Sequence, residues 1–155
     1  MIIRVSQILL SSLLILSSLF INPAYSVPLN DKQKISEHLE FFGFKSSMDG
    51  DSLKATSSQH FPIYLNQTDY GIRFNLALSV NAKAAQNKAK LMDILNALNA
   101  ECRVIKFYLD QGDIVFESLY IGDYNRQEFG AFIQAYLSDY DVVYKNSELS
   151  QYIGN

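Results

Sequence analysis

The stretch GIRFNLALSV, residues 71–80, decides the fold because its apolar and polar side chains alternate. The apolar ones occupy every second position, namely Ile72, Phe74, Leu76, Leu78 and Val80. This period of two predicts a β-strand that buries one face and exposes the other. Sheets solvated on one face are usually antiparallel, since parallel strands tend to be apolar on both faces. We therefore expect an antiparallel sheet covered by helices.

A second pair of strands follows this stretch. Residues 102–109 and 113–121 also alternate apolar with other side chains, and a turn at Asp110 to Asp113 that includes Gly112 joins them. A short connection with glycine between two such segments is typical of a β-hairpin. Cys102 would begin the first strand as a small buried residue. One face of the second strand would carry Val115, Leu119 and Ile121.

Two weaker strand signals precede the opening stretch. Residues 61–65 form one of them, and Pro62 indicates a sheet edge or a strand start, because proline has no backbone N–H to donate. Residues 44–59 alternate little, so we expect only short strand pieces there, around a turn at residues 49–51.

Three helices are predicted from their caps and from apolar residues at helical spacing. The first begins at Asn30, with Gln33 completing a capping box, and ends at Gly43. The second follows the cap Asn81 and packs by the leucines of its later turns. The third begins at the cap Asn125 and carries an aromatic core face.

The C-terminal tail, residues 139–155, predicts either a short strand at residues 142–144 or a final turn of helix. The elements together follow the order α-β-β-β-α-β-β-α. This order is typical of an α+β domain with an antiparallel sheet of about five strands covered by helices. Residues 27–155 have the length of a single domain with its own core.

Residues 1–26 are interpreted as a cleavable export signal peptide. Arg4 precedes an apolar stretch over residues 5–21, and the small residues Ala24 and Ser26 form a cleavage pattern. The alternative is an uncleaved anchor, since the apolar stretch approaches the shortest length that spans a bilayer. With cleavage, we expect a periplasmic or secreted protein that has no membrane association in its mature form.

Charge and motifs exclude several classes of partner and cofactor. The formal net charge is −3 and the basic residues are scattered, which argues against nucleic acid or anionic membranes as partners. The sequence has no glycine-rich phosphate loop, so no nucleotide cofactor is expected. His38 and His60 lack the spacing of metal ligands. We interpret His38 as a helix-boundary residue and His60 as a solvated loop residue, and we expect no metal and no cofactor.

No residue pattern predicts catalysis. A nucleophilic site needs a serine or cysteine that is activated by a nearby base. The sequence has no nucleophile-elbow motif, and its single cysteine, Cys102, lies in a predicted strand. The carboxylates of Asp49 and Asp51 do not continue into the spacing of a calcium loop. We therefore expect a protein that is not an enzyme.

The tyrosines are candidate binding residues. The chain has ten of them and no tryptophan, and Tyr108, Tyr120 and Tyr124 fall in the predicted hairpin and just before the third helix. Such rings suit interfaces because one end is apolar and the other forms hydrogen bonds. The alternative is that each tyrosine completes the rim of an ordinary core.

The run LMDILNALN at residues 91–99, followed by the hairpin and the aromatic helix at residues 128–136, resembles the YbjN family. Members are labelled regulators of sensory transduction, and their fold is similar to that of type III secretion chaperones. Asn96 and Asn99 carry the match, which makes them candidate binding residues. Local capping and turn roles would explain both asparagines as well. The resemblance implies no catalytic residue.

Two leading functions are open at this point, beside an enzyme of unrecognised type, which no pattern of acid, base or nucleophile supports. The first is an exported, non-enzymatic binding module, chaperone-like or regulatory, that holds a protein or peptide segment on its sheet, a sheet edge or an apolar groove beside a helix. Such a module could also be a homodimer. The second is an inhibitor or immunity-type protein that blocks a secreted or envelope enzyme with an irregular segment at residues 46–58.

Overall fold

The computed structural model describes residues 31–154, which form one six-stranded antiparallel sheet and five helices. The strands are β1 (Lys45–Asp49), β2 (Ser52–Thr56), β3 (Ile63–Thr68), β4 (Gly71–Ser79), β5 (Lys106–Asp110) and β6 (Asp113–Ile121). The helices are α1 (Lys32–Phe41), α2 (Ala82–Gln86), α3 (Lys88–Glu101), α4 (Arg126–Tyr144) and α5 (Ser147–Ser150). The α+β class and the antiparallel sheet are confirmed, with one strand more than expected.

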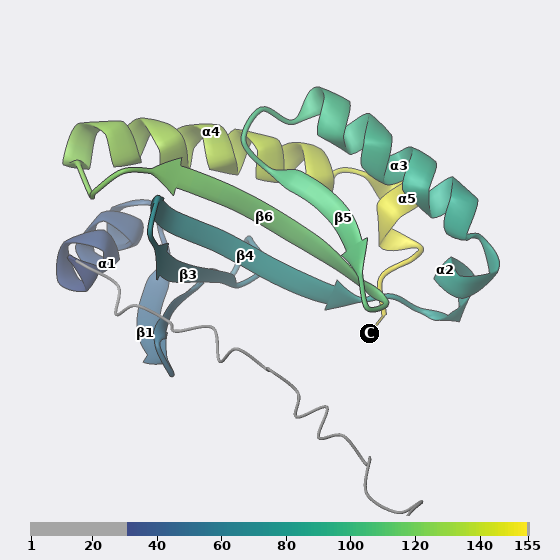
Figure 1. Ribbon diagram of the computed structural model, residues 1–155, viewed down its shortest axis with the longest axis horizontal. Coiled ribbons are helices and arrows are strands. Elements are labelled where there is room, and N and C mark those ends of the chain that lie inside the picture. Colours follow the sequence, from purple (N-terminus) through teal and green to yellow (C-terminus); the bar gives the residue numbers. More distant parts are fainter. Residues whose placement is uncertain (1–30, 155) are drawn as a thin grey trace, which may run out of the picture.

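Strand β4 lies inside the sheet, whose order is β1-β2-β3-β4-β6-β5. Its apolar side chains at Ile72, Phe74 and Leu76 are buried, as the alternation predicts. Helices α3 and α4 run along one side of the sheet, and α1 lies against β1 and β2 (Figure 1). The Phe74 ring meets the Tyr136 ring of α4 at a centroid distance of 5.3 Å, so the core forms between the sheet and this helix.

The short strand pieces expected around a turn at residues 49–51 are confirmed, and residues 44–59 are more regular than the sequence indicates. Strands β1 and β2 form a hairpin in which Lys45 pairs with Thr56 and Asp49 pairs with Ser52. Gly50 turns the chain with a φ of 60°, a conformation that costs glycine little. Only Leu53 and Ala55 of this hairpin are buried hydrophobic residues, which is too short a pattern to predict the full extent of its strands. The expectation of an irregular segment at residues 46–58 is wrong.

Pro62 lies immediately before β3, and β3 is an interior strand between β2 and β4. Its position is therefore the strand start that the sequence allowed, not a sheet edge. The first residue of the strand is Ile63, which has a backbone N–H and pairs with Ala55 of β2. A proline at this place costs the sheet no ladder hydrogen bond.

The end of α1 follows the prediction. Gly43 takes a φ of 83°, and the Phe44 N–H donates to the Leu39 carbonyl at 3.1 Å, which is the Schellman closure. The predicted cap at Asn30 lies outside the described residues, as does the proposed export signal at residues 1–26. Among the described helices, none has the length and hydropathy of a membrane span.

Strand β5 begins four residues later than expected. Cys102 caps the end of α3 and is buried, which raises the pKa of its thiol to about 11. The delay is caused by a residue distant in the sequence, because the Asp139 carboxylate accepts the N–H groups of Val104 at 2.6 Å and Ile105 at 3.1 Å. These amides therefore cannot join a strand ladder, and the prediction of strand at residue 102 is wrong.

The C-terminal tail is helical and anchored. The predicted strand at residues 142–144 is wrong, because α4 continues through Tyr144 and buries Val143 in the core. The alternative, a final turn of helix, is confirmed by α5. The Asn81 side chain, which caps α2, also donates to the carbonyls of Gln151 and Ile153 at 2.9 and 3.1 Å. One asparagine thus joins the end of the chain to the sheet.

Candidate functional site

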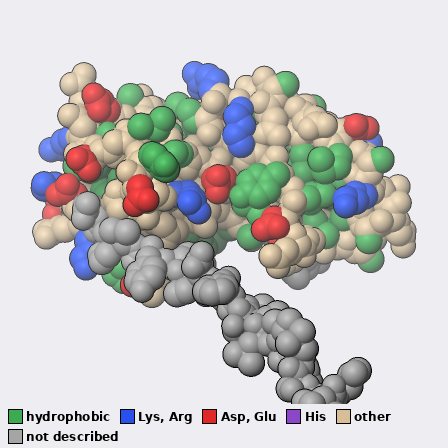
Figure 2. All heavy atoms as spheres, viewed as in Figure 1, with side chains coloured by type: hydrophobic (Ala, Val, Ile, Leu, Met, Phe, Trp, Pro, Cys, Tyr) green, Lys and Arg blue, Asp and Glu red, His purple; other side chains and the backbone are tan. Residues whose placement is uncertain are grey.

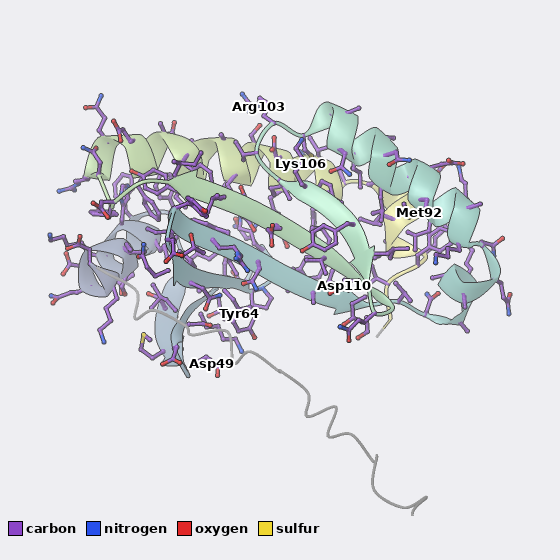
Figure 3. The ribbon with its side chains drawn as sticks, viewed as in Figure 1. Asp49, Tyr64, Met92, Arg103, Lys106 and Asp110 are labelled. Atoms are coloured by element: carbon purple, nitrogen blue, oxygen red, sulfur yellow. The ribbon has the colours of Figure 1, made fainter. Side chains whose placement is uncertain are left out.

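One face of the sheet bears no helix within residues 31–154. Its side chains come from alternate positions of the strands, and cross-strand pairing aligns them in rows. One such row runs through Lys54, Tyr64, Asn75, Glu117 and Lys106. Tyr64 and Lys106 are visible on this side of the ribbon, and α3 and α4 lie beyond it (Figure 3). We call this surface the open face.

An apolar stripe crosses the open face along β6 and its neighbour β5. It consists of Tyr108, Val115, Leu119 and Ile121, and we call it the open-face stripe. Tyr108 is 41% exposed, Leu119 40% and Ile121 77%. Hydrophobic side chains gather in patches between isolated charges on the visible surface (Figure 2). Large apolar side chains that share one exposed stripe are unusual on a surface without a partner.

Polar side chains beside the stripe hold one another in place. The Tyr108 hydroxyl donates to the Glu117 carboxylate at 3.3 Å, and Arg73 Nε lies 3.9 Å from the same carboxylate. Farther along the face, the Asn66 amide donates to Asn75 Oδ1 at 3.3 Å. These contacts reduce the side-chain entropy that a binding partner would otherwise have to remove.

The two edges of the sheet differ. On β5, the Asn99 amide of α3 donates to the Phe107 carbonyl and accepts the Phe107 N–H, both at 2.8 Å. This side chain therefore pairs with the strand edge as another strand would, and it blocks pairing at that point. On the opposite side, β1 has a strand neighbour only in β2 among the described elements.

The five residues predicted to bind do not come together. Tyr108 lies on the open face, Asn99 pairs with the β5 edge, and Asn96 is exposed on α3. Tyr120 is buried, and its hydroxyl donates to the Asp123 carbonyl at 3.1 Å and accepts the Asn125 N–H at 3.2 Å. Tyr124 lines a cleft between α1 and α4.

The histidines occupy two aromatic environments. His38 Nδ1 lies 3.0 Å from the Tyr124 hydroxyl, and its ring stacks on Phe42, so it packs at the boundary of α1 as predicted. The expectation of a solvated His60 is wrong, because its half-buried ring packs between Phe44 and Tyr140 at centroid distances of 5.7 and 5.0 Å. Over residues 31–154, no three His, Cys, Asp or Glu residues are grouped so that they could hold a metal ion.

Sequence reasoning did not identify Arg73, Leu119 and Ile121 as site residues. The shared face of Leu119 and Ile121 was visible in their spacing, but the even positions of the same strand, apart from Ser118, are apolar as well. The structure buries Ile114, Phe116 and Tyr120 and leaves the odd positions on the open face. A weak signal existed in Glu117, whose charge favours the solvated side of the strand.

Comparisons with known proteins agree with this architecture. The family model YbjN, described as "Putative bacterial sensory transduction regulator", matches residues 33–146. The chain is also similar to the crystal structure of YbjN, described as a putative transcription regulator from E. coli, with 17% sequence identity and a TM-score of 0.65. That similarity covers 84% of this chain and 99% of the other, and it confirms the fold. No curated protein sequence matches the chain.

Proposed function

The chain belongs to the YbjN family, whose model spans residues 33–146, and from this premise we propose that it is a regulatory module that binds another protein. The family description names a regulator and no enzyme. In this proposal the chain catalyses no reaction. It acts by binding or releasing another protein on the open face.

The observation that supports the proposal most directly is the open-face stripe. Tyrosine and arginine are enriched at the centres of protein interfaces, and here Arg73 is paired with Leu119 and Tyr108 with Val115. The Arg73, Glu117 and Tyr108 contacts are already formed, so binding would order few further side chains. A sheet face with apolar residues between paired charges, and without a deep cavity in the part that the structure describes, suits a protein surface better than it suits a small molecule.

The charges on the open face are of both signs. Lys54, Arg73 and Lys106 lie on it together with Asp49, Glu117 and Asp110. A face of this kind does not repel a copy of itself, since unlike charges can be placed opposite one another in a symmetric pair. We therefore propose a homodimer or a complex with a protein of mixed charge. Both would have a mass greater than that of one chain.

Export belongs to the same proposal. It rests on the sequence of residues 1–26, with Arg4 before an apolar stretch and small residues at the cleavage position. Mass spectrometry of fractionated cells should find a chain beginning at Val27 in the periplasm or the medium. A chain that keeps residue 1 and stays in the cytoplasm would contradict export without affecting the open face.

The binding proposal is tested by a matched pair of substitutions. Leu119 and Met92 are comparably exposed, at 40% and 36%, but Met92 lies on α3 and not on the open face (Figure 3). The protein is purified from its own cells under native conditions, and light scattering gives the mass of each complex. We expect wild type and Met92→Glu to exceed the mass of one chain and Leu119→Glu to fall to it.

Circular dichroism should show that both variants remain folded. The proposal fails if wild type is a single chain with no protein attached. It also fails if Leu119→Glu and Met92→Glu change the mass equally, because the effect would then not belong to the open face.

A further inference from the structure

A cleft of about 600 Å³ lies between α1 and the start of α4, away from the open-face stripe. The residues that matter for its chemistry are Lys34, Glu37, His38, Phe41, Tyr124 and Arg126. Its volume falls within the range of about 300 to 1,000 Å³ that small-molecule sites usually have. The walls combine aromatic rings with charged groups, and each set is fixed by its own contacts.

The aromatic wall is rigid on one side and exposed on the other. The Tyr124 hydroxyl lies 3.0 Å from His38 Nδ1, and the His38 ring stacks on Phe42 at 5.6 Å. The backbone of Gly130 in α4 comes so close that a Cβ there would lie 3.1 Å from His38 Nε2. These contacts hold the imidazole in place, whereas Phe41 is 83% exposed and presents its ring at the rim.

The charged groups leave one cation available. Lys34 pairs with Asp31 at 2.7 Å, whereas Arg126 forms no ion pair with any residue that the structure describes. Lys34 and Arg126 line the cleft together with Tyr124. Burial raises the pKa of Tyr124, and the charges of Arg126 and Lys34 act in the opposite direction. Glu37 supplies the opposing negative charge of the cleft.

The start of α4 adds a positive dipole end, but two amides of its first turn are already bonded to the cap residue. The Asn125 side chain already accepts the N–H groups of Gln127 and Glu128 at 3.0 and 3.2 Å. An anion in the cleft would therefore be recognised by the Arg126 guanidinium and only assisted by the dipole. The Glu37 carboxylate disfavours a second negative charge, which makes a monoanion a better ligand than phosphate.

We propose that this cleft binds a small aromatic carboxylate, with its carboxylate on the Arg126 guanidinium and its flat body against Phe41 and Tyr124. Guanidinium and carboxylate match in a two-bond geometry, which makes such pairs short and specific. Aromatic rings pack favourably in offset or edge-on arrangements, and the exposed Phe41 ring gains most from such a contact. The site does not depend on the proposed function of the open face.

The test uses 2-naphthoate as the probe and 2-naphthamide as its neutral counterpart of the same shape. Each is titrated into the mature protein while NMR follows the His38 and Tyr124 ring signals. We expect saturable shifts with 2-naphthoate and binding at least about tenfold weaker with 2-naphthamide, since one charge-assisted hydrogen-bonded pair is lost. Inorganic phosphate should produce no saturable shift of these signals.

Two variants complete the test: Arg126→Gln removes the proposed carboxylate partner, and Lys145→Gln is its control. Arg126→Gln should weaken 2-naphthoate about tenfold and leave 2-naphthamide unchanged, and Lys145→Gln, at the other end of α4, should change neither. The site is overturned if 2-naphthoate gives no saturable shift, if both probes bind equally, or if Arg126→Gln has no effect. None of these outcomes bears on the Leu119→Glu experiment, so the two proposals fail separately.

Discussion

The Asn99 side chain forms the hydrogen bonds that a neighbouring strand would form with the edge of β5. Its amide pairs with both backbone groups of Phe107 at 2.8 Å, and it sits on α3, the helix that packs against β5. The paired asparagines in the sequence indicated a capping or a binding role. The structure establishes a pairing partner that is eight residues away in the sequence, which no local pattern could specify.

Removing this amide should destabilise the protein. Asn99→Ala leaves the Phe107 N–H and carbonyl without their partner, so we expect a loss of about 1–3 kcal/mol in the free energy of unfolding. Asn96→Ala, on the exposed side of the same helix, should change it by less than about 0.5 kcal/mol. Urea unfolding measures both, and equal effects would show that the β5 edge does not need the amide.

His38 titrates below its ordinary range for a physical reason. Burial lowers its pKa from 6.5, and the nearby Arg126 guanidinium lowers it further. The unfolded chain then binds more protons than the folded one between the folded pKa and 6.5, so stability rises with pH across that window. NMR titration should give a midpoint below 6.5, and Arg126→Gln should raise it. A midpoint above 6.5, or one unchanged in Arg126→Gln, would contradict this arrangement.

At the scale of elements, local signals located most helices and strands. The caps Asn81 and Asn125 accept two backbone N–H groups each, as the capping patterns predict. The errors concern elements whose limits are set by distant partners. Asp139 delays β5 by binding two amides, and the β1–β2 hairpin, expected only as short strand pieces around a turn, buries too few residues for its full extent to be recognised.

Pairing between β4 and β6 requires glycine at position 71. Its φ is 145°, and a Cβ there would lie 2.0 Å from the Tyr120 carbonyl oxygen and 2.8 Å from the Gly122 nitrogen. Gly71→Ala should therefore cost about 4 kcal/mol or more, by forcing the two strands apart. Thermal unfolding followed by circular dichroism measures the loss.

Gly122→Ala separates this clash from backbone strain. Gly122 also has a positive φ, 94°, but a Cβ there would meet nothing within 4 Å. We expect a cost of only about 1–2 kcal/mol from the backbone conformation. If the two alanine variants lose the same free energy of unfolding, backbone strain alone would account for the loss in Gly71→Ala. The close approach of β4 and β6 would then contribute nothing.

At the scale of the whole molecule, the sequence predicts a sheet with helices on one side but not which face they cover. Strand β6 has apolar residues on both faces, because Phe116 and Tyr120 are buried while Leu119 and Ile121 remain exposed. Only the register with β4, whose alternation is clear, decides between them. The cleft between α1 and α4 joins residues about ninety positions apart and was likewise beyond local patterns.

The molecule has two candidate binding surfaces, the open face and the cleft between α1 and α4, and they share no residue. Helix α1 contributes to the cleft and also packs on β1 and β2, whose other side belongs to the open face. A regulator needs a surface that recognises a partner, and in the proposed function that surface is the open face. To test whether the partner binds the open face, one must find where the partner contacts the protein; the affinity of binding is less informative.

Site-specific photo-crosslinking tests that position most directly. A photoreactive phenylalanine replaces Tyr108 on the open face or Tyr144 on α4, two exposed tyrosines of one chain, in the cells that produce the protein. We predict a discrete crosslinked product, a second copy or another protein, from position 108 and none of that mass from position 144. The same product from both positions, or from position 144 alone, would contradict the account.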